Sequence, residues 1–311
     1  MLKNVTNFIY QKVNEIRDIV GNKKIICAVS GGVDSMTTAV LCHKAVGENL
    51  TAIFIDDGLM RKDEDKFVKE ELKKFGITVK IYERKNLFLN ALRGLTNPEE
   101  KRLAFRETFY KVFKEVIKEE NAHFLAQGTI KADIIETEAK IKTQHNVLSQ
   151  IGINPKKYGL EIIEPLKDLL KPEVRKVAKR LGLSKEVYQR APFPGPGLLC
   201  RILGEVTEER IEIIRKATEI VEKLTKNLRS FQTFPVLLSD KATGIKDFQR
   251  ILGDIIVIRS VDSKDALSAK AKRISYPLLK KIRDALINEI PSCVKVLYDI
   301  TDKPPSTIEY I

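Results

Sequence analysis

The sequence predicts an α/β protein with a doubly wound parallel sheet, followed by a second, smaller α/β domain. Three observations predict it. Apolar runs of strand length alternate with helical patterns up to about residue 180, which is typical of parallel strands joined by crossover helices. Residues 192–197 (PFPGPG) then hold three prolines and two glycines, which exclude a helix or a central strand. Strand and helix patterns resume beyond them. We therefore expect domains at residues 1–190 and 191–311.

The elements of the first domain follow one another as strand and helix. Each expected strand is a short run of mostly apolar, often β-branched residues, and each expected helix repeats its apolar residues at helical spacing. Pro172 suits the first turn of the last helix. In chain order, these elements are strand 24–30, helix 36–46, strand 50–56, helix 63–76, strand 77–83, helix 97–121, strand 123–128, strand 160–166 and helix 171–182.

The second domain shows the same two patterns over a shorter length. Its expected elements are helix 207–227, strand 234–239, strand 254–261, helix 276–290 and strand 294–300. The apolar strands of so small a domain leave an edge or a face that a second copy could cover. We therefore expect this domain to form a homodimer.

Composition and charge limit the class of protein. The 311 residues carry a net charge of +13 and a pI near 9.4, which favours anionic partners such as nucleotides, nucleic acid or an acidic surface. No apolar run approaches the ~20 residues of a membrane span, and the first residues do not resemble a signal peptide, so we expect a cytoplasmic protein. The four cysteines lie far apart and indicate neither a zinc site nor a disulfide framework.

The segment AVSGGVDS (28–35) stands where a strand passes into a helix. At such a turn the helix presents unpaired N–H groups and the positive end of its dipole. Gly31 and Gly32 let the backbone approach an anion, and Ser30 and Ser35 add hydroxyl donors. Because the Gly-Lys-Ser/Thr ending of kinase-type loops is missing and Asp34 would repel a phosphate, we expect Mg²⁺ between them. The alternative interpretation is a tight turn capped by Ser30 and Asp34.

SGGVDS resembles the pyrophosphate-binding loop of the ATP pyrophosphatases, a superfamily that splits ATP between its α and β phosphates. Further segments resemble the GMP synthetase family in the order in which that family has them: FIDDGLMR, NPEEKR, LAQGTI, HNV, EPLKDLLKPEVRK, PFPGPGL and YDITDKPPSTIEYI. Too few residues precede Ser30 for a glutamine amidotransferase domain. The chain therefore resembles the ATP pyrophosphatase subunit of the two-subunit, archaeal-type enzymes, whose ammonia comes from a separate glutamine amidotransferase subunit.

The resemblance implies an amination of xanthosine monophosphate (XMP). ATP adenylates the 2-carbonyl oxygen of the purine and releases pyrophosphate, and ammonia then displaces AMP to give GMP. Two anionic nucleotides must be held in line and their charge neutralised, which fits the basic composition. The resemblance implies no nucleic-acid partner.

The resemblance also assigns site residues. Asp34, as the Mg²⁺ ligand, and Lys171, which contacts phosphate, are implied to be catalytic. His145 is expected beside the adenylated intermediate. It lies in residues 131–158, which are expected to form a lid over the site and include Asp133 and Glu136. The implied ATP site consists of Ala28, Ser30, Gly31, Gly32, Val33, Asp34, Ser35 and Ile55, whose backbone reads the adenine. The implied XMP site consists of Arg102, Gln232 (or its neighbour Thr233), Lys303 and Glu309.

Two other functions fit parts of the sequence. A tRNA-modifying enzyme of the same superfamily would suit the loop and the basic charge, although no cysteine stands in an obvious motif for persulfide transfer. A nucleotide-dependent RNA-binding module without catalysis would also be basic. An assay with XMP distinguishes both from GMP synthesis.

Overall fold

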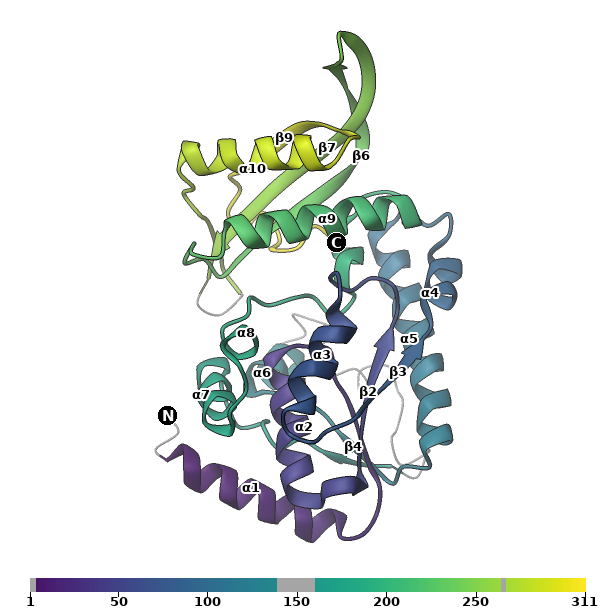
Figure 1. Cartoon of the computed structure of the whole chain (residues 1–311), viewed down its shortest axis with the longest axis vertical. Coiled ribbons are helices and arrows are strands. Elements are labelled where there is room, and N and C mark those ends of the chain that lie inside the picture. Colours follow the sequence, from purple (N-terminus) through teal and green to yellow (C-terminus); the bar gives the residue numbers. More distant parts are fainter. Residues whose placement is uncertain (1–3, 139–159, 264–266) are drawn as a thin grey trace. The chain divides into compact units, whose positions relative to one another are not determined.

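The computed structural model describes residues 4–138, 160–263 and 267–311, which form two compact units (Figure 1). The first unit comprises the described residues of Met1–Asp56, Asp63–Arg84 and Lys111–Arg190. The second comprises those of Asp57–Lys62, Lys85–Tyr110 and Ala191–Ile311. The long helix α5 (Pro98–Glu120) contributes to both.

The first unit contains a parallel sheet of five strands in the order β3-β2-β1-β4-β5. The order reverses beside β1, because the chain moves outward to β3 and then crosses back to β4. This topology confirms the predicted doubly wound sheet. The strands are β1 (Ile25–Ala28), β2 (Leu50–Asp56), β3 (Val79–Glu83), β4 (Phe124–Ala126) and β5 (Glu161–Ile163).

Helices cover both faces of this sheet. The helices α1, α2 and α7 pack against one another, and α2 and α5 lie on opposite sides of the strands (Figure 1), as right-handed crossovers require. The central strands β1, β2 and β4 are largely buried, and Ile25, Ile26 and Cys27 of β1 are fully buried. The helical elements besides α5 are α1 (Val5–Val20), α2 (Val33–Val46), η1 (Gly47–Asn49), α3 (Glu64–Lys73), α6 (Lys131–Glu138), α7 (Lys171–Leu181) and α8 (Lys185–Tyr188).

The helices α1 and α6 were not expected from the sequence. The helix α1 precedes β1 and begins after Asn4, whose side chain accepts a hydrogen bond from the backbone N–H of Asn7 at 3.0 Å. The helix α6 occupies the first residues of the stretch 131–158, which was expected to form a lid. Its Asp133 accepts a hydrogen bond from the N–H of Ile130 at 2.9 Å, so a side chain stabilises the start of this helix.

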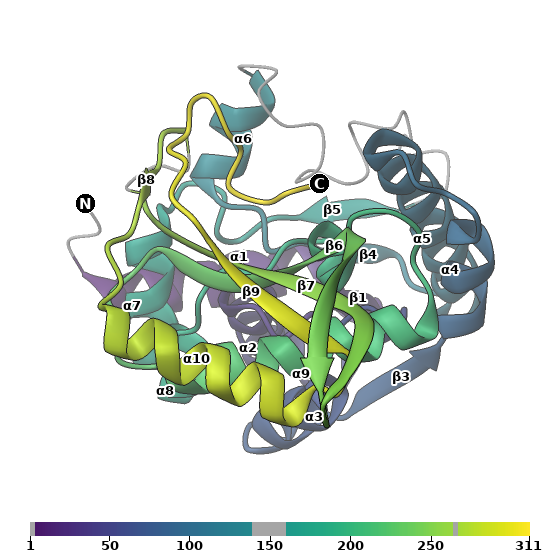
Figure 2. The ribbon, with the colours of Figure 1, turned by 90° about the horizontal axis from the view of Figure 1, so that it is seen from above.

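The second unit contains a mixed sheet of four strands (Figure 2). The hairpin of β6 (Gln232–Lys246) and β7 (Gln249–Asp262) is antiparallel, and β9 (Cys293–Asp299) runs parallel to β7 on its other side. A short strand, β8 (Lys270–Ala271), completes the sheet. The helices α9 (Glu208–Leu224) and α10 (Tyr276–Glu289) pack against β6 and β9 respectively. A short helix α4 (Lys85–Leu92) and the turn η3 (Gly197–Arg201) also belong to this unit.

The β6–β7 hairpin is longer than the expected strands 234–239 and 254–261. It continues to a two-residue turn at Asp247 and Phe248, which both have positive φ (49° and 62°), as hairpin turns of this length require. The run KATGIKDFQR lacks an apolar alternation and an Asn-Gly or Asp-Gly turn, so its sequence carried no strand signal.

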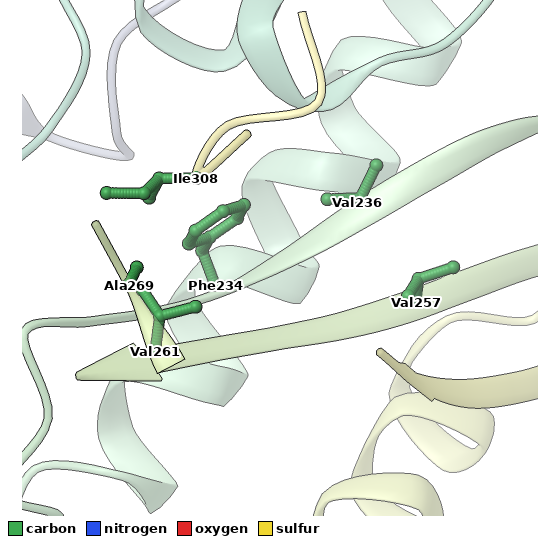
Figure 3. Close-up of a cluster of buried hydrophobic side chains, with 6 residues drawn as sticks. All are labelled: Phe234, Val236, Val257, Val261, Ala269 and Ile308. Atoms are coloured by element: carbon green, nitrogen blue, oxygen red, sulfur yellow. The ribbon is translucent and has the colours of Figure 1, made fainter. Parts of the chain in front are cut away.

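The end of the chain is packed onto this sheet. Ile308 joins a buried cluster with Phe234, Val236, Val257, Val261 and Ala269 (Figure 3). The buried Arg259 donates a hydrogen bond to the carbonyl of Thr307 at 3.0 Å and forms an ion pair with Asp299 at 3.1 Å. The last residues of the chain therefore have a fixed position in the second unit, so their side chains could contribute to a binding site.

Candidate active site

The loop between β1 and α2 is closed by one serine hydroxyl. The Oγ of Ser35 accepts a hydrogen bond from the N–H of Ser30 at 3.2 Å and donates to the carbonyl of Gly32 at 3.2 Å. Across the described ranges, the N–H groups of Gly31, Gly32 and Val33 have no acceptor. Three adjacent unpaired donors at the start of a helix are suited to binding a phosphate.

Asp34 is paired with Lys171, which comes from the start of α7. The ammonium of Lys171 donates a hydrogen bond to Oδ2 of Asp34. Oδ1 of Asp34 is buried, and no residue in the described part of the chain bonds to it. The structure thus brings together two predicted catalytic residues, and one oxygen of Asp34 is left without a partner among the described residues.

The capping interpretation of the loop is wrong. Gly32 is the N-cap of α2, and no side chain of a described residue caps this helix. The hydroxyl of Ser30 lies 3.2 Å from that of Ser35, and Asp34 bonds to Lys171. Neither the side chain of Ser30 nor that of Asp34 caps the helix α2, although the Ser30 hydroxyl contacts Ser35 within the loop.

The backbone after β4 lies directly against the loop. A Cβ atom on Gly128 would lie 2.9 Å from the backbone carbon of Asp34 and 2.9 Å from the backbone nitrogen of Ser35. Backbone atoms cannot move aside as side chains do, so this position requires glycine. Gly128 belongs to the segment LAQGTI, and the start of α2 therefore rests on the end of β4.

An ion pair between a buried carboxylate and a partly buried arginine also contacts the loop. Arg190 binds both carboxylate oxygens of Glu64, at 2.5 and 2.8 Å, and also donates to the carbonyl of Gly31 at 3.4 Å. In a trans peptide the C=O and the next N–H point in opposite directions. Because Arg190 bonds to the carbonyl of Gly31, the N–H of Gly32 points away from Arg190. Sequence analysis missed both residues, because each alone is an ordinary charged residue.

The predicted adenine contact, Ile55, lies beyond the end of the β1–β2 ladder. The two strands pair up to Ile53 and Ala28, and the N–H of Val29 donates to the carbonyl of Ile53 at 2.8 Å. Backbone groups two residues apart in a strand face the same side, so those of Ile55 face the edge where β1 gives way to the loop. Ala28, the last residue of β1, and Val33, the first residue of α2, lie on either side of that loop.

In the second unit, two of the predicted XMP residues are joined by a hydrogen bond. Nε2 of Gln232 donates to Oε1 of Glu309 at 2.5 Å and to the carbonyl of Pro192 at 3.3 Å. Thr233 is instead bonded to the hydroxyls of Ser230 and Ser260, at 2.8 and 2.7 Å. Of the two alternatives, Gln232 and not Thr233 therefore contacts Glu309.

A third residue, which sequence analysis missed, lies beside Glu309. Nε of the buried Arg201 is 3.6 Å from Oε2 of Glu309. Burial raises the pKa of Glu309, and Arg201 opposes that rise. Arg201 stands just after PFPGPG, but an arginine beside a proline-rich turn carries no signal of its own.

The other two predicted XMP residues have different surroundings. Arg102 forms an ion pair with Glu99, and its Nε is buried without a hydrogen bond to any described residue. Its charge acts on the Cys200 thiol, as do those of Arg201 and Glu309, which places it in the same neighbourhood. The backbone of Lys303 exchanges two hydrogen bonds with Ala269, at 2.7 and 3.0 Å. His145 and the side chain of Glu136 lie outside the described residues.

The four cysteines are free and buried. Among the side chains that the structure describes, no group of three or more His, Cys, Asp or Glu could hold a metal ion. In the described part of the chain, no helix is both long and apolar enough to cross a membrane.

Known proteins match nearly the whole chain. Residues 4–185 match the PP-loop domain family, and residues 219–310 match the GMP synthase C terminal domain family. A glutamine-hydrolyzing GMP synthase subunit from Thermococcus kodakarensis is 47% identical over 98% of this chain and 99% of that protein. The protein of the same name from Methanocaldococcus jannaschii is 47% identical over 97% of this chain and 98% of its own length. A solved NH3-dependent NAD synthetase from Campylobacter jejuni shares 18% identity and a TM-score of 0.47, over 60% of this chain and 77% of that one.

Proposed function

Because this chain belongs to the family of these glutamine-hydrolyzing GMP synthase subunits, we propose that it is the ATP-dependent ligase that converts XMP to GMP. The observation that carries the proposal is the loop of residues 30–35 with its three unpaired N–H groups, in a chain that matches the family from end to end. Direct attack of ammonia on C2 of XMP would have to expel an oxide. Adenylation makes the 2-carbonyl oxygen part of a better leaving group, AMP.

The chain's own residues prepare ATP for this reaction. The N–H groups of Gly31, Gly32 and Val33, with the hydroxyls of Ser30 and Ser35, bind the β and γ phosphates that depart as pyrophosphate. The ammonium of Lys171 neutralises charge that develops on the phosphates. The backbone of Ile55 binds the adenine edge. The α phosphate is then held in place, because both the adenine and the β and γ phosphates of ATP are bound.

The donor set at Asp34 fits a magnesium ion. Oδ1 of Asp34 is buried and lacks a partner among the described residues, while Lys171 occupies Oδ2. Mg²⁺ commonly takes one or two protein carboxylates and completes its shell with phosphate oxygens and water. Asp34 would hold it, and when bound it would offset the phosphate charge. Lys171 keeps Asp34 oriented, and His145, outside the described residues, is also assigned to the proposed site.

The XMP site is proposed in the second unit, around Glu309. A carboxylate accepts hydrogen bonds from purine N–H groups, and Gln232 fixes this one at 2.5 Å. Arg102 and Lys303 supply positive charge for the nucleotide phosphate. The first unit would thus serve ATP, and the second unit, which includes Arg102, would serve XMP.

We also propose a source for the ammonia and a surface for dimerisation. The relatives are named as one subunit of a glutamine-hydrolyzing enzyme, so a separate glutamine amidotransferase subunit would supply ammonia to this chain. The homodimer would form through the second unit. At the tip of the β6–β7 hairpin, Phe248 is fully exposed, and Ile245 and Leu252 are largely exposed. Apolar side chains that are exposed together on a surface can mark an interaction site.

The test is an assay with defined substrates. The protein is incubated with ATP, Mg²⁺, ammonium salt and either XMP or unmodified tRNA. We expect pyrophosphate, AMP and GMP in equal amounts with XMP, and no pyrophosphate with tRNA. Pyrophosphate release that does not depend on XMP would overturn the proposal, and release that depends on tRNA would favour a tRNA-modifying enzyme.

A further inference from the structure

Arg201 carries a guanidinium group that is buried without a full set of hydrogen bonds. The residue is 1% exposed, and its guanidinium lies 4.7 Å from the ring centre of Phe193 and 4.6 Å from that of Phe234. Its Nε and Nη1 are buried and have no hydrogen-bond partner among the described residues. Burying a charge in this way is costly unless an opposite charge lies nearby.

That opposite charge is the carboxylate of Glu309. Nε of Arg201 lies 3.6 Å from Oε2 of Glu309, which is too long for a hydrogen bond but close for an ion pair. Oε1 of the same carboxylate is held by Gln232. Oε2 is buried and accepts no hydrogen bond from any described residue. Arg201 therefore attracts this oxygen mainly through its charge, as an ion-pair partner at 3.6 Å.

We propose that Arg201 is a positioning residue for purine recognition, which keeps Glu309 ionised and leaves Oε2 free to accept a purine N–H. This inference rests on the proposed function, which assigns Glu309 to XMP. The two aromatic rings hold the guanidinium by cation–π contacts, so Arg201 cannot turn toward the ligand itself. Its role is to act through Glu309.

The charges around Glu309 support a role for Arg201 that acts through Glu309. Burial raises the pKa of Glu309, and the groups that lower it are Arg201, then Gln232, then Arg61. The Cys200 thiol also faces this carboxylate, and burial raises the pKa of that thiol to about 12, so it stays neutral. Without Arg201, Glu309 would take up a proton at higher pH. A protonated carboxyl is a poorer acceptor, and XMP binding would then fail at a pH where the unaltered protein still binds.

The experiment measures kcat/KM for XMP across pH in Arg201→Met, in which a side chain of similar length fills the space between the rings. We expect KM for XMP to rise about tenfold or more, from weakening of one charge-assisted hydrogen bond. We also expect the pH at which kcat/KM is half-maximal to move upward, while KM for ATP stays unchanged. Arg201→Lys, which keeps the charge, should restore the pH profile.

The matched control is Arg210→Met. Arg210 is a partly buried arginine of the same unit that donates to the carbonyls of Glu205 and Leu238, at 2.7 and 2.6 Å. Its loss should lower stability without moving the pH profile for XMP. A folded Arg201→Met protein with the unaltered profile and KM for XMP would overturn the inference. If Arg201→Met does not fold, Arg201→Gln, neutral but polar, gives the same test. Failure of the unaltered protein to make GMP would instead contradict the proposed function.

Discussion

The ammonium of Lys171 donates a hydrogen bond to Oδ2 of Asp34, across 137 positions of the sequence. The two side chains come from the first turns of α7 and α2, and both keep partial access to solvent. An ion pair with this exposure contributes little to stability, about 0–1 kcal/mol. Its position at a phosphate-binding loop therefore indicates a role in function.

Asp34→Asn tests that role. Asparagine keeps the size and one oxygen but loses the charge, so a cation is bound less well and Lys171 is left unpaired. We expect the XMP-dependent release of pyrophosphate to fall at least about a hundredfold, while the free energy of unfolding changes by less than about 1 kcal/mol. Urea denaturation followed by circular dichroism checks the second value. A loss of stability in proportion to the loss of activity would show that Asp34 is structural.

Two glycines of the same site should respond differently to alanine. A Cβ on Gly128 meets the backbone of Asp34 and Ser35 at 2.9 Å, whereas one on Gly32 meets only the Ser30 hydroxyl, at 3.4 Å. Gly128→Ala should therefore lower stability by about 1–3 kcal/mol and also reduce activity. Gly32→Ala should fold normally but raise KM for ATP, because the Cβ lies where the phosphate approaches. Unfolding midpoints and ATP kinetics of the two variants separate these effects, and equal destabilisation would contradict the assignment.

The Arg190–Glu64 pair should behave as one unit. Breaking a buried pair on one side costs about 3–5 kcal/mol, because it leaves an uncompensated charge. Glu64→Gln and Arg190→Met should each destabilise the protein, and the double variant should lose less than their sum. We also expect KM for ATP to rise in all three, since the peptide between Gly31 and Gly32 is no longer held.

The control for this pair is Glu71→Gln. Glu71 is a buried carboxylate of the same helix, α3, that bonds to Lys74 and to the N–H of Ser184 without touching the loop. It should lower stability and leave KM for ATP unchanged. If Glu71→Gln raised KM for ATP as much as Glu64→Gln does, the pair would have no special effect on the loop.

Because Lys101 is buried, we expect the free energy of unfolding to depend on pH. Its ammonium is fully buried and donates to the carbonyls of Ile202 and Gly204, at 2.7 and 2.9 Å. Burial, aided by the charge of Arg210, lowers the pKa of Lys101 to about 8 from its usual 10.5. Between these two values the unfolded chain binds more protons than the folded one, so stability rises with pH by up to about 1 kcal/mol per pH unit. The rise should vanish in Lys101→Met, measured by urea denaturation at each pH. An identical slope in the variant would refute the assignment.

The exposed hairpin tip predicts a dimer. Phe248 is fully exposed, and covering such a side chain contributes about 1.5–3 kcal/mol. Phe248→Ser should shift sedimentation at micromolar concentration from dimer toward monomer. Tyr10→Ser, which removes an exposed aromatic side chain from α1 in the first unit, should not. A monomeric unaltered protein would contradict the proposal.

Sequence analysis predicted the parallel sheet, the loop and the family, and the comparisons confirm the family. These features depend on neighbouring residues, such as the strand 50–56 or the run SGGVDS. The partners of the loop could not be predicted in this way. Glu64 and Arg190 are 126 positions apart, and each resembles a solvated charge until the fold brings them together. Arg201 was missed for the same reason, because its burial depends on packing against Phe193 and Phe234.

The central claim is that this chain attaches AMP to the 2-carbonyl oxygen of XMP, and the most direct test follows that oxygen. XMP labelled with ¹⁸O at C2 is incubated with the protein, ATP, Mg²⁺ and ammonium salt, and the products are separated for mass spectrometry. We expect one labelled oxygen in the phosphate of AMP, in amounts equal to the GMP formed, and none in pyrophosphate. Label in pyrophosphate or inorganic phosphate, or GMP formed with unlabelled AMP, would contradict the claim.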